Sequence, residues 1–474
     1  MCCLLIVGFH NTKGNGEYTK MNKRSKIVRT LLVASALMSA SAFSAFAAQN
    51  GWAYEGTDWY YYDDGDKVYN SWESNDAKTF KFYLGDEGKM LTDTIVDDGS
   101  GRLYYVNGDG AQVKNEWRYT HEDGEEPRWY YFGSDGRAYE SGWKTINGYK
   151  YHFTDSKMDY GWLDEDGQML DEEWDDDTAW ESAKYYVGDE NQGWRFENKW
   201  IELDSFDSDK YPDNDTIWVF MGADGAKQVD KQKLINGVTY RFDENGAMLN
   251  DWYISDVASD SNAKYYGEDG ERISGEWFQA VPSEEMNSED HEDDTLRWFY
   301  ANSSGNVIKN TLKKISGKYY LFDENGIMQT GFVIVDDNDH IIEKLGDAED
   351  GYPSSDEIKD STGKLMFFNE NGAAATSRIS IELEDDTYTM RFSSRGVAEH
   401  GVDDNYLYDH GILLKADSSE EKYSVETVDG KEYLVNTSGK VVKSGEYKDT
   451  KADLKYKVEG NNSDGYTITV ENLD

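Results

Sequence analysis

The stretch RWYYFGSDGRAYESGWKTINGYKYHF, residues 128–153, decides how this chain folds. It runs an aromatic cluster into a Gly-containing turn, then a Gly-Trp pair, then an Asn-Gly pair and a second aromatic cluster. Aromatic and polar residues alternate over four or five positions, which is typical of a half-buried β-strand. The Gly-containing tetrads, such as GSDG here and DENG elsewhere, supply the positive φ of a tight turn. The pattern predicts short β-hairpins that turn at these tetrads.

The same three motifs recur in a fixed order along the chain. The first is an aromatic cluster, the second begins with Ile-Asn/Ser-Gly, and the third carries a Tyr pair. The first motif begins at Trp59, Trp129, Trp218 and Trp298. The second begins at Ile146, Ile235 and Ile315, and the Tyr pair of the third begins at Tyr104, Tyr185 and Tyr265. Trp129 and Trp218 are 89 residues apart, and Trp218 and Trp298 are 80 apart. The chain is therefore a repeat of three-motif units of about 80 residues, each motif being about 20 residues long.

A repeat of such small hairpins predicts a particular fold class. A lone hairpin of this size buries too little apolar surface to be stable in water. Stacking each hairpin on its neighbours builds a continuous core. We therefore predict an all-β solenoid of stacked short β-hairpin repeats with acidic loop insertions. These insertions contain all four prolines (Pro127, Pro212, Pro282 and Pro353) and are expected between the motifs, away from the ladders.

The aromatic content divides the repeat region in two. All 15 tryptophans lie between Trp52 and Trp298, and the C-terminal part keeps the period with Tyr and Leu instead. We predict an aromatic-rich repeat solenoid over residues 49–375 and degenerate repeats with a C-terminal cap over residues 376–474. A separate small β-domain at the C-terminus is the alternative.

The N-terminal region predicts export. Residues 21–48 combine a basic segment, a short apolar run and small residues suited to cleavage, as in a secretory signal peptide. Residues 1–20 precede this signal and its own Met, and are expected to be a mis-assigned upstream segment. Both cysteines lie there, which excludes a disulfide framework from the exported chain. No later apolar run predicts a membrane span.

The charge of the chain is strongly negative. The net charge is −46, and it becomes −51 without residues 1–48, which hold six basic residues and one acidic residue. Such a field disfavours nucleic acid as a partner. Disordered acidic chains are poor in aromatics, whereas this chain is 14% aromatic with only four prolines. The chain is therefore expected to fold, with acidic loops in solvent.

The pattern of aromatic cluster, Gly turn, Gly-Trp and Ile-Asn-Gly resembles the cell-wall-binding repeats of Gram-positive bacteria. These include choline-binding repeats, glucan-binding repeats and the related repeats of clostridial toxins. The likeness covers residues 52–375 and continues weakly to about residue 450. It implies a hairpin solenoid in which aromatic side chains of adjacent hairpins enclose a quaternary ammonium group. The same ring faces can stack on a pyranose, so both ligand classes stay open.

The resemblance directs attention to aromatic side chains at the junctions between hairpins. The best candidate junction combines Trp143, Tyr151, Phe153 and Trp162. The predicted ligand-binding aromatic residues are Trp129, Trp143, Tyr151, Trp162, Trp218, Tyr240, Trp252, Trp277, Trp298 and Tyr320. For each ring, packing within the solenoid is the alternative role.

Lysines at three positions bear on the choice of ligand. The choline-binding pattern would place Trp where this chain has Lys150, Thr239 and Tyr319, and Lys184 and Lys264 precede the Tyr pairs of the third motif. A lysine ammonium inside an aromatic site would compete with choline for the ring faces. On this argument a neutral or polymeric glycan is the favoured ligand.

Catalytic and metal-binding patterns are not evident in the sequence. The chain has no HExxH, GxSxG or phosphate-binding Gly loop. Its seven histidines form no recognisable constellation: His10, His121, His152, His291, His340, His400 and His410. The acidic stretch of residues 164–177 offers oxygen ligands but lacks the EF-hand spacing, so a solvated loop is favoured over a calcium site. We expect no catalytic residue, no cofactor and no metal site.

These observations predict a secreted, non-catalytic repeat protein associated with the cell wall or cell surface. It would bind envelope polysaccharide or teichoic acid through aromatic grooves between hairpins, using many weak sites at once. Because teichoic acids are also anionic, divalent cations are a further expected partner. The alternatives are a structural or host-interacting surface protein without a small-ligand site, and choline binding proper.

Overall fold

The computed structural model describes residues 50–170, 179–204, 216–255, 262–348 and 351–473. The predicted signal peptide, the segment before it and residues 171–177 of the acidic stretch lie outside the described residues. The chain divides into two compact units, Met1–Leu249 and Asn250–Asp474. Each is described by itself.

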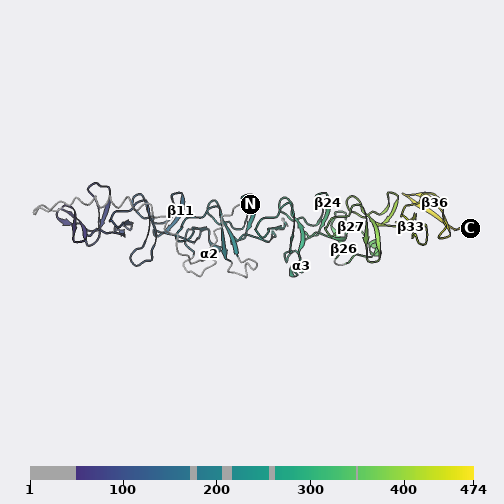
Figure 1. The fold of residues 1–474 in the computed structure, drawn as a ribbon, viewed down its shortest axis with the longest axis horizontal. Helices are drawn as coiled ribbons and strands as arrows, with labels where there is room; N and C mark the ends of the chain where they lie inside the picture. The colour runs from purple at the N-terminus through teal and green to yellow at the C-terminus, as the bar shows by residue number, and fades with distance from the viewer. Residues whose placement is uncertain (1–49, 171–178, 205–215, 256–261, 349–350, 474) are drawn as a thin grey trace. The chain divides into compact units, whose positions relative to one another are not determined.

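The first unit consists almost entirely of short antiparallel strands (Figure 1). Its elements are β1 (Gly51–Glu55), β2 (Asp58–Asp63), β3 (Asp66–Lys67), β4 (Ser71–Ser74), β5 (Lys81–Leu84), β6 (Thr94–Asp97), β7 (Leu103–Val106), β8 (Glu116–Thr120), β9 (Arg128–Phe132), β10 (Gly142–Ile146), β11 (Tyr149–Thr154), β12 (Lys157–Met158), β13 (Trp162–Leu163), α2 (Ala179–Ser182), β14 (Tyr185–Tyr186), β15 (Lys199–Asp204), β16 (Thr216–Met221), β17 (Lys231–Ile235) and β18 (Val238–Phe242). Apart from the three-stranded sheets β1-β2-β3 and β10-β11-β12, its sheets are two-stranded hairpins of consecutive strands.

The second unit begins in the same way and then forms larger sheets. Its elements are β19 (Trp252–Tyr253), β20 (Lys264–Tyr265), β21 (Trp277–Ala280), α3 (Ser288–Glu292), β22 (Arg297–Tyr300), β23 (Thr311–Ile315), β24 (Lys318–Phe322), β25 (Gly331–Val335), β26 (Ile341–Gly346), α4 (Ser355–Asp360), β27 (Lys364–Phe368), β28 (Arg378–Glu382), β29 (Thr387–Arg391), β30 (Gly401–Asp403), β31 (Tyr406–Asp409), β32 (Ile412–Leu413), β33 (Tyr423–Val428), β34 (Lys431–Asn436), β35 (Gly445–Asp449), β36 (Leu454–Asn461) and β37 (Gly465–Asn472). The last ten strands form two five-stranded sheets, in the orders β28-β29-β32-β31-β30 and β33-β34-β37-β36-β35. The domain boundary expected near residue 375 stays a prediction.

Two-residue turns close the hairpins where the sequence has Asn-Gly or an equivalent. Ile146 pairs with Tyr149 across Asn147 and Gly148, whose φ angles are 52° and 89°. Positive φ at both central positions defines the type I′ turn, whose twist matches that of the flanking strands. The β17–β18 and β33–β34 hairpins turn in the same way.

The Gly-containing tetrads have a different role from the one the sequence predicted. After β18, the DENG tetrad closes only a single bridge, between Phe242 and Met248. Asp243 stabilises this turn, because its Oδ1 accepts hydrogen bonds from the backbone N–H groups of Asn245 and Ala247, at 2.9 and 2.8 Å. The longer pairing of β18 is with β17, which precedes it. The hairpin expected across the tetrad is thus one bridge long.

The second residue after each tetrad links one hairpin to the preceding one. The Met248 N–H donates to the Trp218 carbonyl at 2.7 Å, and the Met328 N–H donates to the Trp298 carbonyl at 2.9 Å. Equivalent bonds join Met90 to Trp59, Gln112 to Lys81, Ala138 to Leu103, Lys227 to Lys184, Val307 to Ala263, Ala374 to Tyr319 and Ala398 to Leu365. The predicted all-β solenoid of stacked hairpins is therefore confirmed within each unit.

The core runs along the stack as a series of small clusters. Most hairpins contribute a fully buried phenylalanine; examples are Phe82, Phe132, Phe153, Phe242, Phe299, Phe322 and Phe368. Phe132, Phe153 and Phe242 pack against rings of their own and the adjacent hairpin. Burial of these rings is the main favourable term in stacking.

The acidic insertions lie inside hairpins as well as between them, which corrects the expected placement. Residues 121–127 join β8 to β9, and residues 281–296, which include α3, join β21 to β22 (Figure 1). A hairpin end tolerates extra residues because a longer loop adds little closure entropy. Pro127, Pro282 and Pro353 stand outside the strands, and Pro212 lies outside the described residues.

Among the described residues, no helix is both long enough and apolar enough to cross a membrane.

Candidate aromatic binding sites

The same five-ring arrangement occurs three times in the described residues. We name the three copies the first, second and third aromatic clusters. They comprise Trp117, Trp129, Tyr131, Tyr151 and Phe153; Trp200, Trp218, Phe220, Tyr240 and Phe242; and Trp277, Trp298, Tyr300, Tyr320 and Phe322.

The geometry of the three clusters is nearly identical. The two indole rings of each cluster are 6.4, 6.5 and 6.4 Å apart between centroids, with interplanar angles of 87°, 80° and 82°. The first-strand tryptophan and the tyrosine of the next hairpin are 4.9, 4.9 and 4.7 Å apart. Two perpendicular indoles and a phenol ring therefore form a corner that recurs in each copy.

Strand register assembles each cluster from two adjacent hairpins. In the first cluster Trp117 pairs with Tyr131, and Trp129 lies two residues earlier on the same face of β9. Tyr151 and Phe153 lie two residues apart on β11 of the next hairpin. Because side chains of a strand alternate between faces, this spacing turns both rings toward Trp117.

Each cluster has a buried phenylalanine, which we call its floor, and two partly exposed tryptophans, which we call its rim. The floor phenylalanines Phe153, Phe242 and Phe322 are fully buried. The six tryptophans are not: Trp298 is 42% exposed, and the other five are half-buried. The rim therefore keeps apolar ring area available to a ligand. Burial also raises the pKa of Tyr151 above its ordinary value.

A related arrangement occurs at the N-terminal end of the first unit. Trp52 contacts Phe82 at 5.2 Å, and Trp59 and Phe80 are packed against the same buried phenylalanine. Phenylalanine here takes the place that tyrosine holds in the other three clusters. Sequence reasoning did not select Trp52, Trp117 or Trp200 as site residues. Trp117, Trp200 and Trp277 lie 83 and 77 residues apart, and this period was the available signal.

Trp143 lies outside these clusters, and the structure does not bring it together with Tyr151, Phe153 and Trp162 in one site. Trp143 packs against His152 at 4.9 Å and Tyr185 at 5.2 Å. The guanidinium of Arg195 covers the same two aromatic rings, 5.3 Å from Trp143 and 5.8 Å from Tyr185. A fixed cation of the chain therefore takes the position that a ligand cation would take here.

Trp162 and Trp252 lie in hydrophobic cores, where each is 9% exposed. The Trp252 indole N–H also donates to the Val281 carbonyl at 2.7 Å. The remaining predicted residues, namely Trp129, Tyr151, Trp218, Tyr240, Trp277, Trp298 and Tyr320, are members of the three clusters.

The three lysines raised as competitors of choline lie away from the tryptophans of the clusters. Lys150 is exposed, the Lys184 ammonium pairs with Glu165 at 2.5 Å, and the Lys264 ammonium lies 5.9 Å from the Tyr253 ring. In the part of the chain that the structure describes, no lysine or arginine lies over any of the six cluster tryptophans.

Family models match stretches that contribute to these clusters. The model described as "Choline-binding repeat" matches residues 80–112. The model described as "Putative cell wall binding repeat" matches residues 128–138, 141–156 and 310–328, which include Trp129, Tyr151 and Tyr320.

Curated relatives match the chain at low identity. The chain is 23% identical to Glucosyltransferase-I of Streptococcus downei over 447 residues, which cover 82% of this chain and 26% of that protein. It is 26% identical over 213 residues to Glucosyltransferase-S of Streptococcus mutans, covering 44% and 12%. The chain thus spans about a quarter or less of the length of these relatives.

Two solved structures from Streptococcus pneumoniae are similar in part. CbpJ has 20% identity and a TM-score of 0.37, covering 69% of this chain and all of that one. Choline binding protein F has 18% identity and a TM-score of 0.34, covering 75% of this chain and all of that one. The family models, with the hairpin fold of the chain itself, show that it carries repeats of the Gram-positive cell-wall-binding family, which includes choline-binding repeats.

Proposed function

We propose that the chain holds a polymer of the Gram-positive cell envelope through its three aromatic clusters. The observation that carries this proposal is the recurrence of one ring geometry with a half-exposed rim. A ring needed only for packing can be buried completely, as Trp162 and Trp252 nearly are. The cluster tryptophans instead keep ring area in solvent at all three copies, and apolar area left in solvent lowers stability unless a partner covers it.

The arrangement of two tryptophan rings and one tyrosine ring in each cluster favours a compact ligand group that is rich in C–H bonds. Two perpendicular indoles and a phenol can all face one quaternary ammonium, whose methyl groups carry the positive charge. A pyranose is flatter and stacks on one ring at a time. Choline carried on teichoic acid is therefore the ligand we favour, and a neutral glycan is the alternative. The position of the lysines away from the six tryptophans supports this order.

Charge supports the same ligand. A chain with a net charge of −46 repels a polyanion but attracts its cationic substituents. The second cluster adds a local carboxylate, because Glu202 pairs with Trp218 across the hairpin. The equivalent neighbours are Tyr119 in the first cluster and Gln279 in the third.

We further propose that the chain acts by binding and not by catalysis, and that it is retained at the cell surface. Its curated relatives are named glucosyltransferases, and this chain spans only a minor part of their length. The shared part consists of repeat hairpins, which supply binding surface. Incubation with sucrose, glucans and purified walls is expected to release no product that a blank lacks.

The decisive experiment is a pull-down on purified Gram-positive walls, with free choline and soluble glucan as separate competitors. The chain is compared with a variant carrying Trp129→Ala, Trp218→Ala and Trp298→Ala. Leu296→Ala is the matched control, because Leu296 is 58% exposed and lies two residues before Trp298.

The outcomes separate the ligand classes. Release by choline, with binding lost in the triple variant and kept in the control, supports the favoured ligand. Release by glucan alone moves the proposal to a neutral glycan. Wall binding that survives in a folded triple variant, or no wall binding by the unmodified chain, would overturn the role of the clusters.

A further inference from the structure

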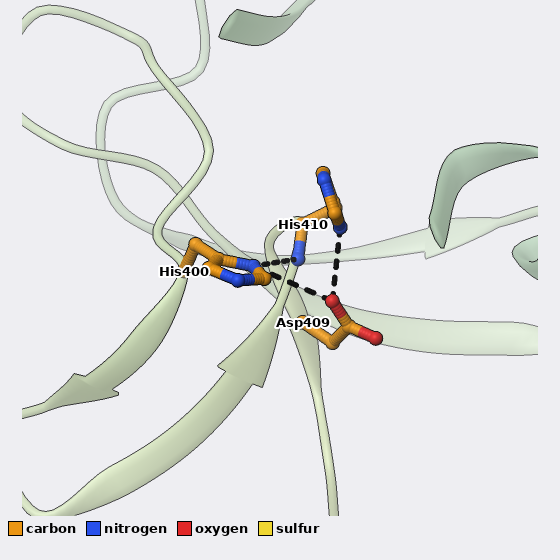
Figure 2. A group of neighbouring side chains, drawn as sticks. All are labelled: His400, Asp409 and His410. Carbon is orange, nitrogen blue, oxygen red and sulfur yellow. Dashed lines mark hydrogen bonds and ion pairs between the residues drawn. The ribbon is translucent and has the colours of Figure 1, made fainter. Parts of the chain in front are cut away.

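Two histidines and an aspartate converge near the end of the first five-stranded sheet. Figure 2 shows the side chains of His400, Asp409 and His410 turned toward one another. One nitrogen of each imidazole and one Asp409 carboxylate oxygen lie within 4.8 Å of one another. No such constellation was predicted from the sequence, although His400 and His410 both stand in an acidic-His-Gly triplet, EHG at 399–401 and DHG at 409–411.

The turn between β31 and β32 fixes two of these residues. Asp409 pairs with Ile412 across His410 and Gly411, whose φ angles are 45° and 89°. The comparable turn before β11 has Asn-Gly at these positions, and Asn and His are both enriched at positive φ. The turn therefore tolerates histidine, and Asn would serve it equally well. Nothing in the turn itself requires an imidazole.

Backbone and side-chain contacts bring His400 to the same turn. The Gly411 N–H donates to the carbonyl of Glu399 at 2.7 Å, next to His400. The His410 N–H donates to Nδ1 of His400 at 3.3 Å, so Nδ1 is the unprotonated nitrogen, and a metal ion bound there would replace this long hydrogen bond. The other nitrogen, Nε2, lies 3.1 Å from a carboxylate oxygen of Asp429. Asp429 comes from the turn between β33 and β34, and its negative charge beside Nε2 favours the tautomer that carries the proton on Nε2.

The distances within the cluster suit a small divalent cation. The Asp409 oxygen lies 3.4 Å from His400 Nδ1 and 2.9 Å from His410 Nδ1. Metal–ligand bonds of about 2.1 Å in a tetrahedron place ligand atoms about 3.4 Å apart. The Asp429–His400 contact matches the carboxylate–histidine–metal pattern, in which an outer carboxylate orients the ligand and raises its basicity.

We propose that His400, Asp409 and His410 bind a transition-metal dication of the Zn²⁺ class, with Asp429 as the positioning carboxylate. Two imidazoles and one carboxylate favour Zn²⁺, Ni²⁺ or Cu²⁺ over Ca²⁺ and Mg²⁺, which prefer oxygen ligands alone. The side chains of Asp409 and His410 are 22% and 24% exposed, so the site is open enough to admit an ion and water. The bound ion would tie the segment after β29 to the turn of the next hairpin.

The test is a Zn²⁺ titration of the full chain by calorimetry, in excess Ca²⁺ to occupy the acidic surface. Cys2→Ser and Cys3→Ser form the background, so that the thiols do not bind zinc. We expect one Zn²⁺ per chain and at least a tenfold loss of affinity in His410→Asn, which keeps a residue suited to the turn. His400→Gln should have the same effect, and Asp429→Asn a smaller one. His340→Asn is the matched control, because His340 faces the single carboxylate of Asp336 at 3.5 Å.

Two results would overturn the site. Zinc binding of equal affinity in His400→Gln and His410→Asn would assign it to surface carboxylates. Complete displacement by Ca²⁺ would do the same. Circular dichroism of each variant verifies that the β-structure is intact, so that a loss of binding is not a loss of fold. Because this cluster shares no residue with the aromatic clusters, its failure leaves the proposed wall binding unaffected.

Discussion

At the residue scale, the same side chain serves packing at one position and exposes a ring at another. Trp252 is 9% exposed and contacts Tyr265 and Phe299 at 5.0 and 4.9 Å, whereas Trp298 is 42% exposed at the rim of the third cluster. Both residues look alike in sequence, because each precedes an aromatic residue in a short strand. What distinguishes them is the number of elements packed on the ring, which depends on neighbours far along the chain.

Alanine substitution at these two positions should separate stability from binding. Trp252→Ala removes a core ring and is expected to lower the free energy of unfolding by about 3–5 kcal/mol, with ligand stoichiometry unchanged in the folded fraction. Trp298→Ala should cost about 1 kcal/mol or less and remove one ligand site. Urea unfolding and a calorimetric choline titration measure the two effects. A Trp298→Ala chain with full stoichiometry would contradict the assignment of the third cluster.

From the burial of Lys227 we predict that the free energy of unfolding rises with pH in the alkaline range. Lys227 is 5% exposed; its ammonium donates to the carbonyls of Trp180 and Glu181, at the end of α2. Burial lowers its pKa from 10.5 to about 8. Between these values the unfolded chain binds more protons than the folded chain, so the contribution of Lys227 to stability rises with pH from about 8 to 10.5.

The measurement is urea unfolding between pH 7.5 and 10 for the unmodified chain and Lys227→Met. The difference between the two removes the titration of other groups, such as the buried tyrosines. The unmodified chain should gain stability relative to the variant by up to about 1.4 kcal/mol per pH unit above pH 8. A constant difference across this range would show that the lysine titrates at its ordinary pKa when folded.

At the element scale, the presence of short strands could be predicted from the sequence, but the partner of each strand could not. Alternation correctly predicted short strands, because it depends on residues close in sequence, whereas the tight turn at Asn147-Gly148 was missed because the turns were expected at the tetrads. The partner of each strand was harder to predict. Strands were expected to pair across the DENG tetrad, whereas β18 pairs mainly with β17, which precedes it. The site shows the same limit. Tyr151 was predicted as a site residue, but the ring beside it is Trp117, which lies 34 residues earlier on another hairpin.

Two strand-initial glycines test how tightly the second unit is packed. Gly142 and Gly331 begin β10 and β25, with φ angles of 82° and 74°. A Cβ on Gly142 would meet nothing within 4 Å, whereas one on Gly331 would lie 2.2 Å from the backbone oxygen of Gly346. Gly142→Ala should therefore cost only the conformational penalty, about 1 kcal/mol. Gly331→Ala should cost at least twice as much, because backbone cannot move aside cheaply.

Hydrogen exchange measured for each unit is the suitable readout, since a local change need not shift a global transition. Gly331→Ala should lower protection in β25 and its partners β26 and β27, and Gly142→Ala should change protection little. Equal effects would mean that β26 moves away from β25 at small cost.

At the scale of the whole molecule, repetition determines how weak sites act together. The first two clusters lie in the first unit and the third in the second unit. A ligand with a single head group can occupy each cluster independently. A polymer that carries many such groups converts later contacts into intramolecular ones, which raises the apparent affinity without any new contact. Single, double and triple alanine variants at Trp129, Trp218 and Trp298 distinguish the two regimes.

For free choline, each substitution should remove one site and leave the dissociation constant of the remaining sites unchanged. On purified walls, each substitution should lower the apparent affinity by at least tenfold, so that the triple variant loses wall binding. Parallel choline titrations and wall-binding isotherms measure both quantities on the same variants. If the affinity for walls falls only in proportion to the number of sites, the clusters act independently. The repeat would then increase the number of ligands bound without increasing the apparent affinity. Both ligands are measured on the same variants, so partial unfolding would weaken the binding of free choline and of walls alike. A loss of affinity for walls alone therefore cannot result from unfolding.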